Sequence, residues 1–168
     1  MKEILSEAPK RVTVSKTQRN WVVTVNLNIE EVDDGFTCDS YSVVVDHKPE
    51  RDDILASVIE AINHKTDMKI LSGYVWNGKP VWLSTENQFN FKAAYDVAVQ
   101  TCGGTLPVKF KLGEDEEGKP VYHTFKSMTA FTDFFTGALV FIQQALNEGW
   151  AEKDSAEQWI DELVGSGE

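Results

Sequence analysis

The side chains best suited to chemistry are few and scattered along the chain. His47, His64 and His123 stand far apart, and none has the second histidine four residues away that a metal-binding helix provides. Cys38 and Cys102 also lack a nearby partner, and GxSxG, P-loop and GxGxxG motifs do not occur. We therefore expect no catalytic residues, no cofactor and no metal site, and we interpret the histidines as surface or helix-capping residues.

Two groups of acidic residues are the remaining candidates for ion binding or acid–base chemistry. The run Glu114–Glu117 could attract a cation, but it lacks the alternating ligands and the glycine of an EF-hand loop. We interpret it as a solvated loop tip and leave cation binding open. Asp46, Asp52 and Asp53 could pair as carboxylates, but charge at a helix N-terminus explains them as well.

The most informative stretch is a tight hairpin that contains two of the five tryptophans. Asn77-Gly78 separates two apolar segments, which is the strongest short signal for a type I′ turn. This turn pairs Trp76 with Lys79, and continues with Val75 opposite Pro80 and Tyr74 opposite Val81. Pro80 has no N–H to offer a further strand, so we expect an edge strand there.

Trp76 and Trp82 should lie on opposite faces of this hairpin, because side chains alternate along a strand. A two-stranded hairpin has difficulty burying both faces. Two interpretations remain open: each face packs on an element of the same chain, or one face docks on another chain, where aromatic residues are enriched. We take Trp76, Pro80 and Trp82 as the candidate interface.

The rest of the chain predicts an α+β fold in which antiparallel hairpins are each followed by a helix. Alternating apolar residues over 21–29, between shorter strands near Val12 and Tyr41, predict a three-stranded antiparallel meander in the first 46 residues. Pro49 and its acidic neighbours predict a helix that ends near His64-Lys65.

Three further helices are expected. The first is capped by Ser84 or Thr85 and stops at Gly103-Gly104. It should bury Phe91, Ala94, Tyr95, Ala98 and Cys102. The second, capped by Ser127 and ended by Gly149, should bury Phe131, Phe134, Phe135, Ala138, Leu139, Ile142, Ala145 and Leu146. A short last helix should bury Trp159, Ile160 and Leu163.

An internal repeat has consequences for the architecture. Gly78-Lys79-Pro80-Val81 recurs forty residues later as Gly118-Lys119-Pro120-Val121, and aromatic positions of the two following helices coincide at the same offset. We interpret this as a hairpin–helix repeat; reuse of turn residues by chance is the alternative. The predicted domains are residues 1–65, a meander plus helix, and residues 74–164, two hairpin–helix units plus the last helix, with one compact domain as the alternative.

Composition and charge limit the classes of partner. The 168 residues carry a formal net charge of −11, which repels phosphate backbones and anionic membranes, so we expect no nucleic-acid or membrane partner. The chain starts without a continuous apolar run, so we expect no secretory signal, and its most apolar run, residues 134–142, is too short for a membrane span. The two cysteines are expected to be buried, reduced thiols, with a disulfide as the alternative.

From residue 82 to residue 163 the order of features resembles an uncharacterised domain family of tailed-bacteriophage and prophage tail-region proteins. The landmarks are the strand end Trp82-Leu83, the strand-opening Gly104, the hairpin residue Tyr122 and the long aromatic helix 128–146. Asn147 follows that helix, and the last helix ends in Glu162-Leu163. The resemblance implies a tail or tail-fibre role and supplies no active-site residues.

The expected function is therefore a non-enzymatic structural or adaptor subunit of a bacteriophage virion, acting by protein–protein contact. Its partners would be other virion proteins, in a homo-oligomer or a hetero-assembly, after synthesis in the cytoplasm of a host bacterium. The alternative is a small acidic phage effector or assembly chaperone that binds a host or phage protein.

Overall fold

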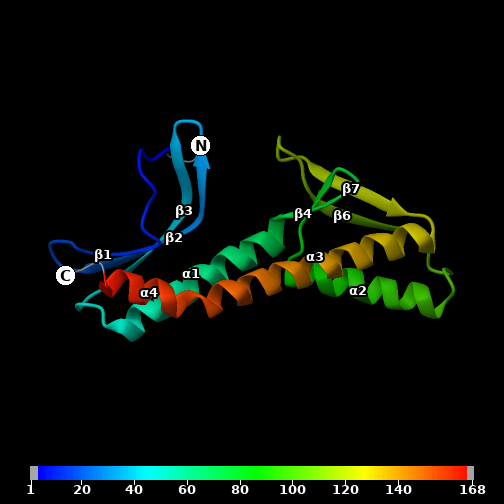
Figure 1. The fold of residues 1–168 in the computed structure, drawn as a ribbon. Helices are drawn as coiled ribbons and strands as arrows, with labels where there is room; N and C mark the ends of the chain where they lie inside the picture. The colour runs from blue at the N-terminus through cyan, green and yellow to red at the C-terminus, as the bar shows by residue number, and fades with distance from the viewer. Residues whose placement is uncertain (1–3, 166–168) are drawn as a thin grey trace. The chain divides into compact units, whose positions relative to one another are not determined.

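A computed structural model describes residues 4–165, and this part of the chain contains seven strands and four helices (Figure 1). In chain order the elements are β1 (Val12–Lys16), β2 (Trp21–Val32), β3 (Gly35–Val45), α1 (Arg51–Ser72), β4 (Tyr74–Trp76), β5 (Lys79–Val81), α2 (Thr85–Gln100), β6 (Val108–Glu114), β7 (Pro120–Phe125), α3 (Met128–Asp154) and α4 (Ala156–Gly165). The fold is α+β with antiparallel sheets, which confirms the predicted class.

The chain divides into two compact units, each with a hydrophobic core of its own. Unit 1 comprises residues 1–64 and 149–168, and unit 2 comprises residues 65–148. The division falls inside α1 and inside α3, so each of these helices contributes residues to both units. This boundary lies next to the predicted one at residue 65, but no linker marks it.

Unit 1 is built on the meander that the alternating pattern predicted. β2 pairs with β1 on one side and with β3 on the other, and Val23 and Val25 of β2 are completely buried. The same core contains Ile62 of α1 and Ile160 of α4. The sequence grouped the last helix with the second domain. The structure instead packs its buried face against the first sheet, a contact between distant segments that no local pattern encodes.

In unit 2 the hairpin has the predicted turn and register. Asn77 and Gly78 both have positive φ, at 48° and 72°, as a type I′ turn requires. Tyr74 pairs with Val81, Val75 with Pro80 and Trp76 with Lys79. Ser84 caps α2, its side chain accepting a hydrogen bond from the Asn87 N–H.

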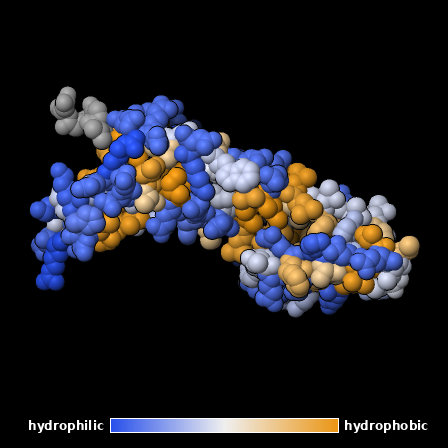
Figure 2. All heavy atoms as spheres, turned by 90° about the horizontal axis from the view of Figure 1, so that it is seen from below, coloured by the Kyte–Doolittle hydropathy of each residue, from blue (hydrophilic) through white to orange (hydrophobic). Residues whose placement is uncertain are grey.

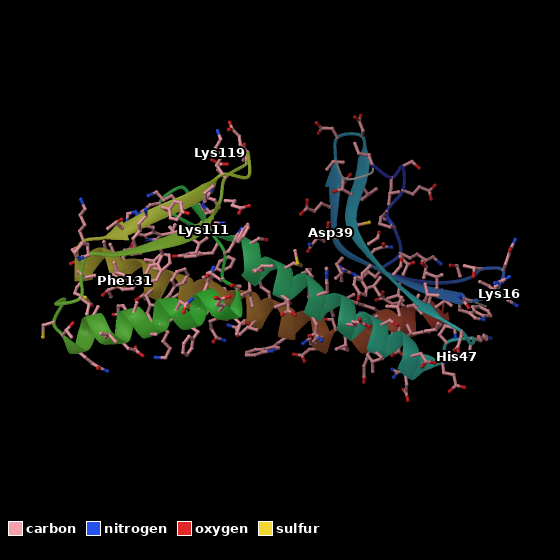
Figure 3. All side chains as sticks on the ribbon, turned by 180° about the vertical axis from the view of Figure 1, so that it is seen from behind. Lys16, Asp39, His47, Lys111, Lys119 and Phe131 are labelled. Atoms are coloured by element: carbon pink, nitrogen blue, oxygen red, sulfur yellow. The ribbon has the colours of Figure 1, made fainter. Side chains whose placement is uncertain are left out.

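The second half of unit 2 has the same element order, as the proposed repeat requires. β6 and β7 form an antiparallel hairpin, and α3 follows directly after Lys126 and Ser127. Phe131 on α3 lies against this hairpin (Figure 3), with its ring 4.7 Å from that of Phe125 and 6.0 Å from that of Phe110. Residues 74–100 and 106–140 are thus each a hairpin followed by a helix.

Two residues expected in the core of unit 2 lie at the surface. Leu139 on α3 is 51 % exposed, whereas its neighbours Phe134 and Ala138 are buried. Cys102 is exposed because α2 ends at Gln100 and the chain then turns, with φ of 50° at Cys102. Cys38 is half-buried, so the expectation of two buried cysteines is wrong, although both are free thiols.

Two helices run further than the sequence predicted. α1 continues past His64-Lys65 to Ser72, since residues 65–72 contain no helix breaker before Gly73 and Ile70 packs against the core of unit 2. α3 continues through Gly149 to Asp154. A single glycine inside a helix costs only about 1 kcal/mol relative to alanine, and the residues after it favour a helix.

The formal charge is divided unevenly between the units. Unit 1 contains 8 basic and 18 acidic residues, a formal charge of −10, whereas unit 2 contains 8 basic and 9 acidic residues, a formal charge of −1. Unit 2 can therefore approach another protein with little net electrostatic repulsion, while unit 1 favours positively charged partners.

Candidate functional site

Trp76, the first residue of the predicted interface, is a core residue of unit 2. Only 7 % of it is exposed, and its Nε1–H donates a 2.9 Å hydrogen bond to Oδ2 of Asp133. Its ring packs edge-on against His123 at 4.9 Å and Phe134 at 5.4 Å. The assignment of Trp76 to an interface with another chain is therefore wrong: α3 and β7 already cover that face of the hairpin.

Trp82 and Pro80 lie on the opposite face, as the alternation of side chains predicted. Trp82 is 36 % exposed, and Lys111 Nζ lies 5.3 Å from the centre of its ring. Pro80 is half-buried, and in the described part of the chain its strand β5 pairs only with β4. Two residues further on, the Trp82 N–H donates a 2.7 Å hydrogen bond to the Leu112 carbonyl of β6. The hairpin edge is therefore partly covered by β6.

This outer strand face also includes the exposed Tyr122 of β7. The ammonium of Lys109 lies 4.6 Å from the centre of the Tyr122 ring, which repeats the lysine–aromatic arrangement at Lys111 and Trp82. Lys111 and Lys119 mark the β6–β7 hairpin in Figure 3. The lysines partly cover both rings, which leaves this face less apolar than its tryptophan and tyrosine suggest.

Another apolar surface of unit 2 lies on the helices, between α2 and α3. Figure 2, seen from below, shows hydrophobic surface gathered over the helices of this unit. A groove of about 190 Å³ separates α2 and α3, and we call it the α2–α3 groove. It is lined by Leu83, Gln88, Phe89, Phe91, Lys92, Phe135, Ala138, Leu139 and Ile142.

The rim of the α2–α3 groove exposes large apolar side chains. Phe89 is 70 % exposed and Leu139 is 51 % exposed. Lys92 is the one charged residue in the lining, and its Nζ is paired with Asp96 at 2.7 Å. A second, more polar hollow shares Leu83, Gln88 and Ile142 with the groove and extends from it toward Leu71 and Asp67. The groove therefore offers an apolar, nearly uncharged surface to a partner.

The sequence contained a signal for this surface that the prediction did not use. Phe89 and Phe91 are two residues apart on a helix, so their side chains point to nearly opposite sides. Phe91 is buried, and Phe89 must therefore point outward. The exposure of Leu139 was missed for a different reason. Leu139 follows Phe135 at helical spacing, which indicated a core position, but it is the neighbouring Ala138 that is buried in the core.

The predicted loop tip at residues 114–117 is closed by its own hydrogen bonds. Asp115 Oδ1 accepts bonds from the N–H groups of Glu117 and Lys119, at 3.0 and 2.9 Å. Lys111 and Lys119 pair with Glu114 and Glu117. Among the described residues no three His, Cys, Asp or Glu side chains gather as metal ligands would.

His123 departs from the expectation that the histidines are surface or cap residues. It is half-buried beside Trp76 and Phe125, and its Nδ1 accepts a 3.0 Å hydrogen bond from Lys79 Nζ. Burial lowers the pKa of His123 below its usual value, and the charge of Lys79 lowers it further. His47 is different: hydrogen bonds to Asp46 and Asp53 raise the pKa of His47.

Acidification should therefore destabilise unit 2 through His123. The pKa of His123 in the folded state lies below the unfolded value of 6.5. The contribution of neutral His123 to stability is therefore fully present above pH 6.5 and is lost as the pH falls through the folded-state pKa. We expect H123Q to weaken the fall in melting temperature between about pH 7.5 and 5.5. The pKa of His47 in unit 1 is shifted in the opposite direction, so the contribution of His47 to stability is lost as the pH rises. H47N is therefore the matched control. An unchanged pH profile in H123Q would contradict this role.

No helix in the described part of the chain is both long and apolar enough to cross a membrane. Comparison with known proteins found no matching family model, no matching curated protein and no matching solved structure.

Proposed function

We propose that this protein is a non-enzymatic adaptor or structural subunit of a bacteriophage virion, in its tail region, and that it acts by protein–protein contact. The observation that carries the contact is the α2–α3 groove, where Phe89 and Leu139 expose apolar surface on a folded unit. The resemblance over residues 82–163 supports the assignment to the tail region.

The occupant that fits the groove is an apolar, uncharged segment of another virion protein. The lining offers aromatic and aliphatic side chains, and its one charge, on Lys92, is already neutralised by Asp96. A charged segment would lose its hydration without gaining an ion pair in this groove. Hydrophobic burial, which is not directional, therefore supplies the attraction, and the shape of the groove selects the partner.

The charge of unit 1 favours a second candidate function. Its formal charge of −10 suits a small phage effector or assembly chaperone that binds a positively charged host or phage protein. Such a protein would act in the infected cell and be absent from mature particles. The two functions are therefore distinguished by whether the chain is found in purified virions.

The test combines virion composition with groove variants. We expect mass spectrometry to detect the chain in purified particles, and the double variant F89S/L139S to fold normally but to be depleted from them. V99S/V140S is the control, because Val99 and Val140 are also exposed, at 49 % and 51 %, on the same helices but do not line the groove. Absence of the wild-type chain from particles would favour the effector or chaperone, and equal incorporation of both double variants would exclude the groove as the contact.

A further inference from the structure

β3 forms one edge of the three-stranded sheet in unit 1 (Figure 1), and in the described part of the chain the only bridge on that edge is the one between Leu5 and Phe36. Near the hairpin tip, Phe36 exchanges two backbone hydrogen bonds with Leu5, both of 2.8 Å. Backbone groups of alternate residues point to the same side of a strand, so those of Ser40, Ser42 and Val44 face this edge too. Within residues 4–165 no backbone hydrogen bond reaches the outward groups of these three residues.

This edge lacks the features by which proteins normally prevent strand addition. Edge strands are usually interrupted by proline, lysine, inward-pointing charge or a bulge. Residues 40–45 read Ser-Tyr-Ser-Val-Val-Val, without a charge or a proline. The register irregularity lies on β2, between Leu27 and Glu30, and leaves β3 regular. The edge is therefore ready to pair with an extended segment.

The surrounding charges indicate which segment that is. Asp39 is exposed on β3 (Figure 3), Asp33 and Asp34 form the turn before it, and Asp46 after it is exposed and paired with His47. A second copy would bring another unit of charge −10 against this edge, which opposes self-pairing. A positively charged segment would instead be attracted at both ends of the uncharged stretch 40–45, where the acidic residues lie.

We propose that the β3 edge binds an extended, positively charged segment of a partner protein as a fourth strand of the sheet. The outward backbone groups of Ser40, Ser42 and Val44 supply the hydrogen bonds, as in other cases of strand addition. The acidic residues at both ends of β3 select lysine or arginine in the segment. This contact belongs to unit 1, so it is separate from the α2–α3 groove and goes beyond the proposed function.

The test uses a defined probe, a fluorescent peptide of alternating lysine and threonine, with the full-length chain. A peptide of the same charge with proline at every third position cannot form a strand and serves as the control probe. We expect saturable binding of the first peptide alone, with slower amide exchange at Ser40, Ser42 and Val44. S42P removes one outward N–H without changing the charge and should weaken binding about tenfold, whereas S42A should not.

Several results would overturn the proposal. Equal binding of the two peptides, or equal binding by S42P and S42A, would show attraction to the acidic surface without strand pairing. Absence of saturable binding would show that the edge does not accept such a segment. Protection of Ser40, Ser42 and Val44 in a dimer without peptide, detected by sedimentation, would show that a second copy occupies the edge. Since none of these readouts involves Phe89 or Leu139, failure here leaves the proposed function untouched.

Discussion

Replacing Phe134 by alanine is expected to lower the free energy of unfolding by about 3–5 kcal/mol. Phe134 is fully buried in unit 2, and its ring lies 5.4 Å from that of Trp76, 5.1 Å from that of Phe91 and 4.9 Å from that of Phe125. Truncation removes the centre of this aromatic cluster, and the rigid rings around it can fill the cavity only in part. Urea denaturation followed by far-UV circular dichroism measures the loss.

The control for this prediction is Leu139→Ala, on the same helix. Leu139 is half-exposed at the groove rim, so its truncation should change the free energy of unfolding by less than about 1 kcal/mol. Equal effects of the two substitutions would contradict the assignment of Phe134 to the core and of Leu139 to the surface.

The second large effect is expected for Ile160→Ala in α4, at about 2–5 kcal/mol. Ile160 is completely buried in the core that also contains Val23 and Val25 of β2. Its truncation should therefore weaken unit 1. Hydrogen exchange is the informative measurement, since the amides of β1, β2 and β3 should lose protection, although α4 lies more than a hundred residues later in the chain.

Asp161→Asn is the matched control, because Asp161 is exposed and pairs with Arg51 at 3.3 Å on the surface. Exposed ion pairs contribute about 0–1 kcal/mol, so this variant should leave exchange in the sheet nearly unchanged. If Ile160→Ala instead lowered the exchange protection of the amides of β6 and β7 and left that of β1, β2 and β3 unchanged, the result would support the predicted grouping of α4 with the second domain.

The local features of the fold could be predicted because short-range rules determine them. Asn77-Gly78 fixes a two-residue turn, and the turn fixes the register of Trp76 opposite Lys79. The alternation over β2 likewise predicted the meander. The helix ends predicted at His64-Lys65 and at Gly149 were wrong, because neither is a strong stop signal when the residues after it favour a helix.

The candidate site could be predicted only in part. A period of two placed Trp76 and Trp82 on opposite faces, but which face α3 covers depends on tertiary structure. The register of the hairpin does not show that the indole N–H of Trp76 donates a hydrogen bond to Asp133 of α3. The α2–α3 groove arises where two helices that are separated in the sequence approach each other. The spacing of Phe89 and Phe91 could place Phe89 on the outer side of its helix, but that Leu139 lies at the same groove could be recognised only after both helices were placed.

The most direct test of the central claim, contact through the α2–α3 groove, is photo-crosslinking inside assembled particles. A benzophenone side chain would replace Phe89, with Val99 on the same helix as the control position, and the crosslinked products would be identified by mass spectrometry. We predict a crosslink from position 89 to one other virion protein, through an apolar, uncharged segment, and none from position 99. Crosslinks of equal yield from both positions, or none from position 89 in particles that contain the chain, would contradict contact through this groove.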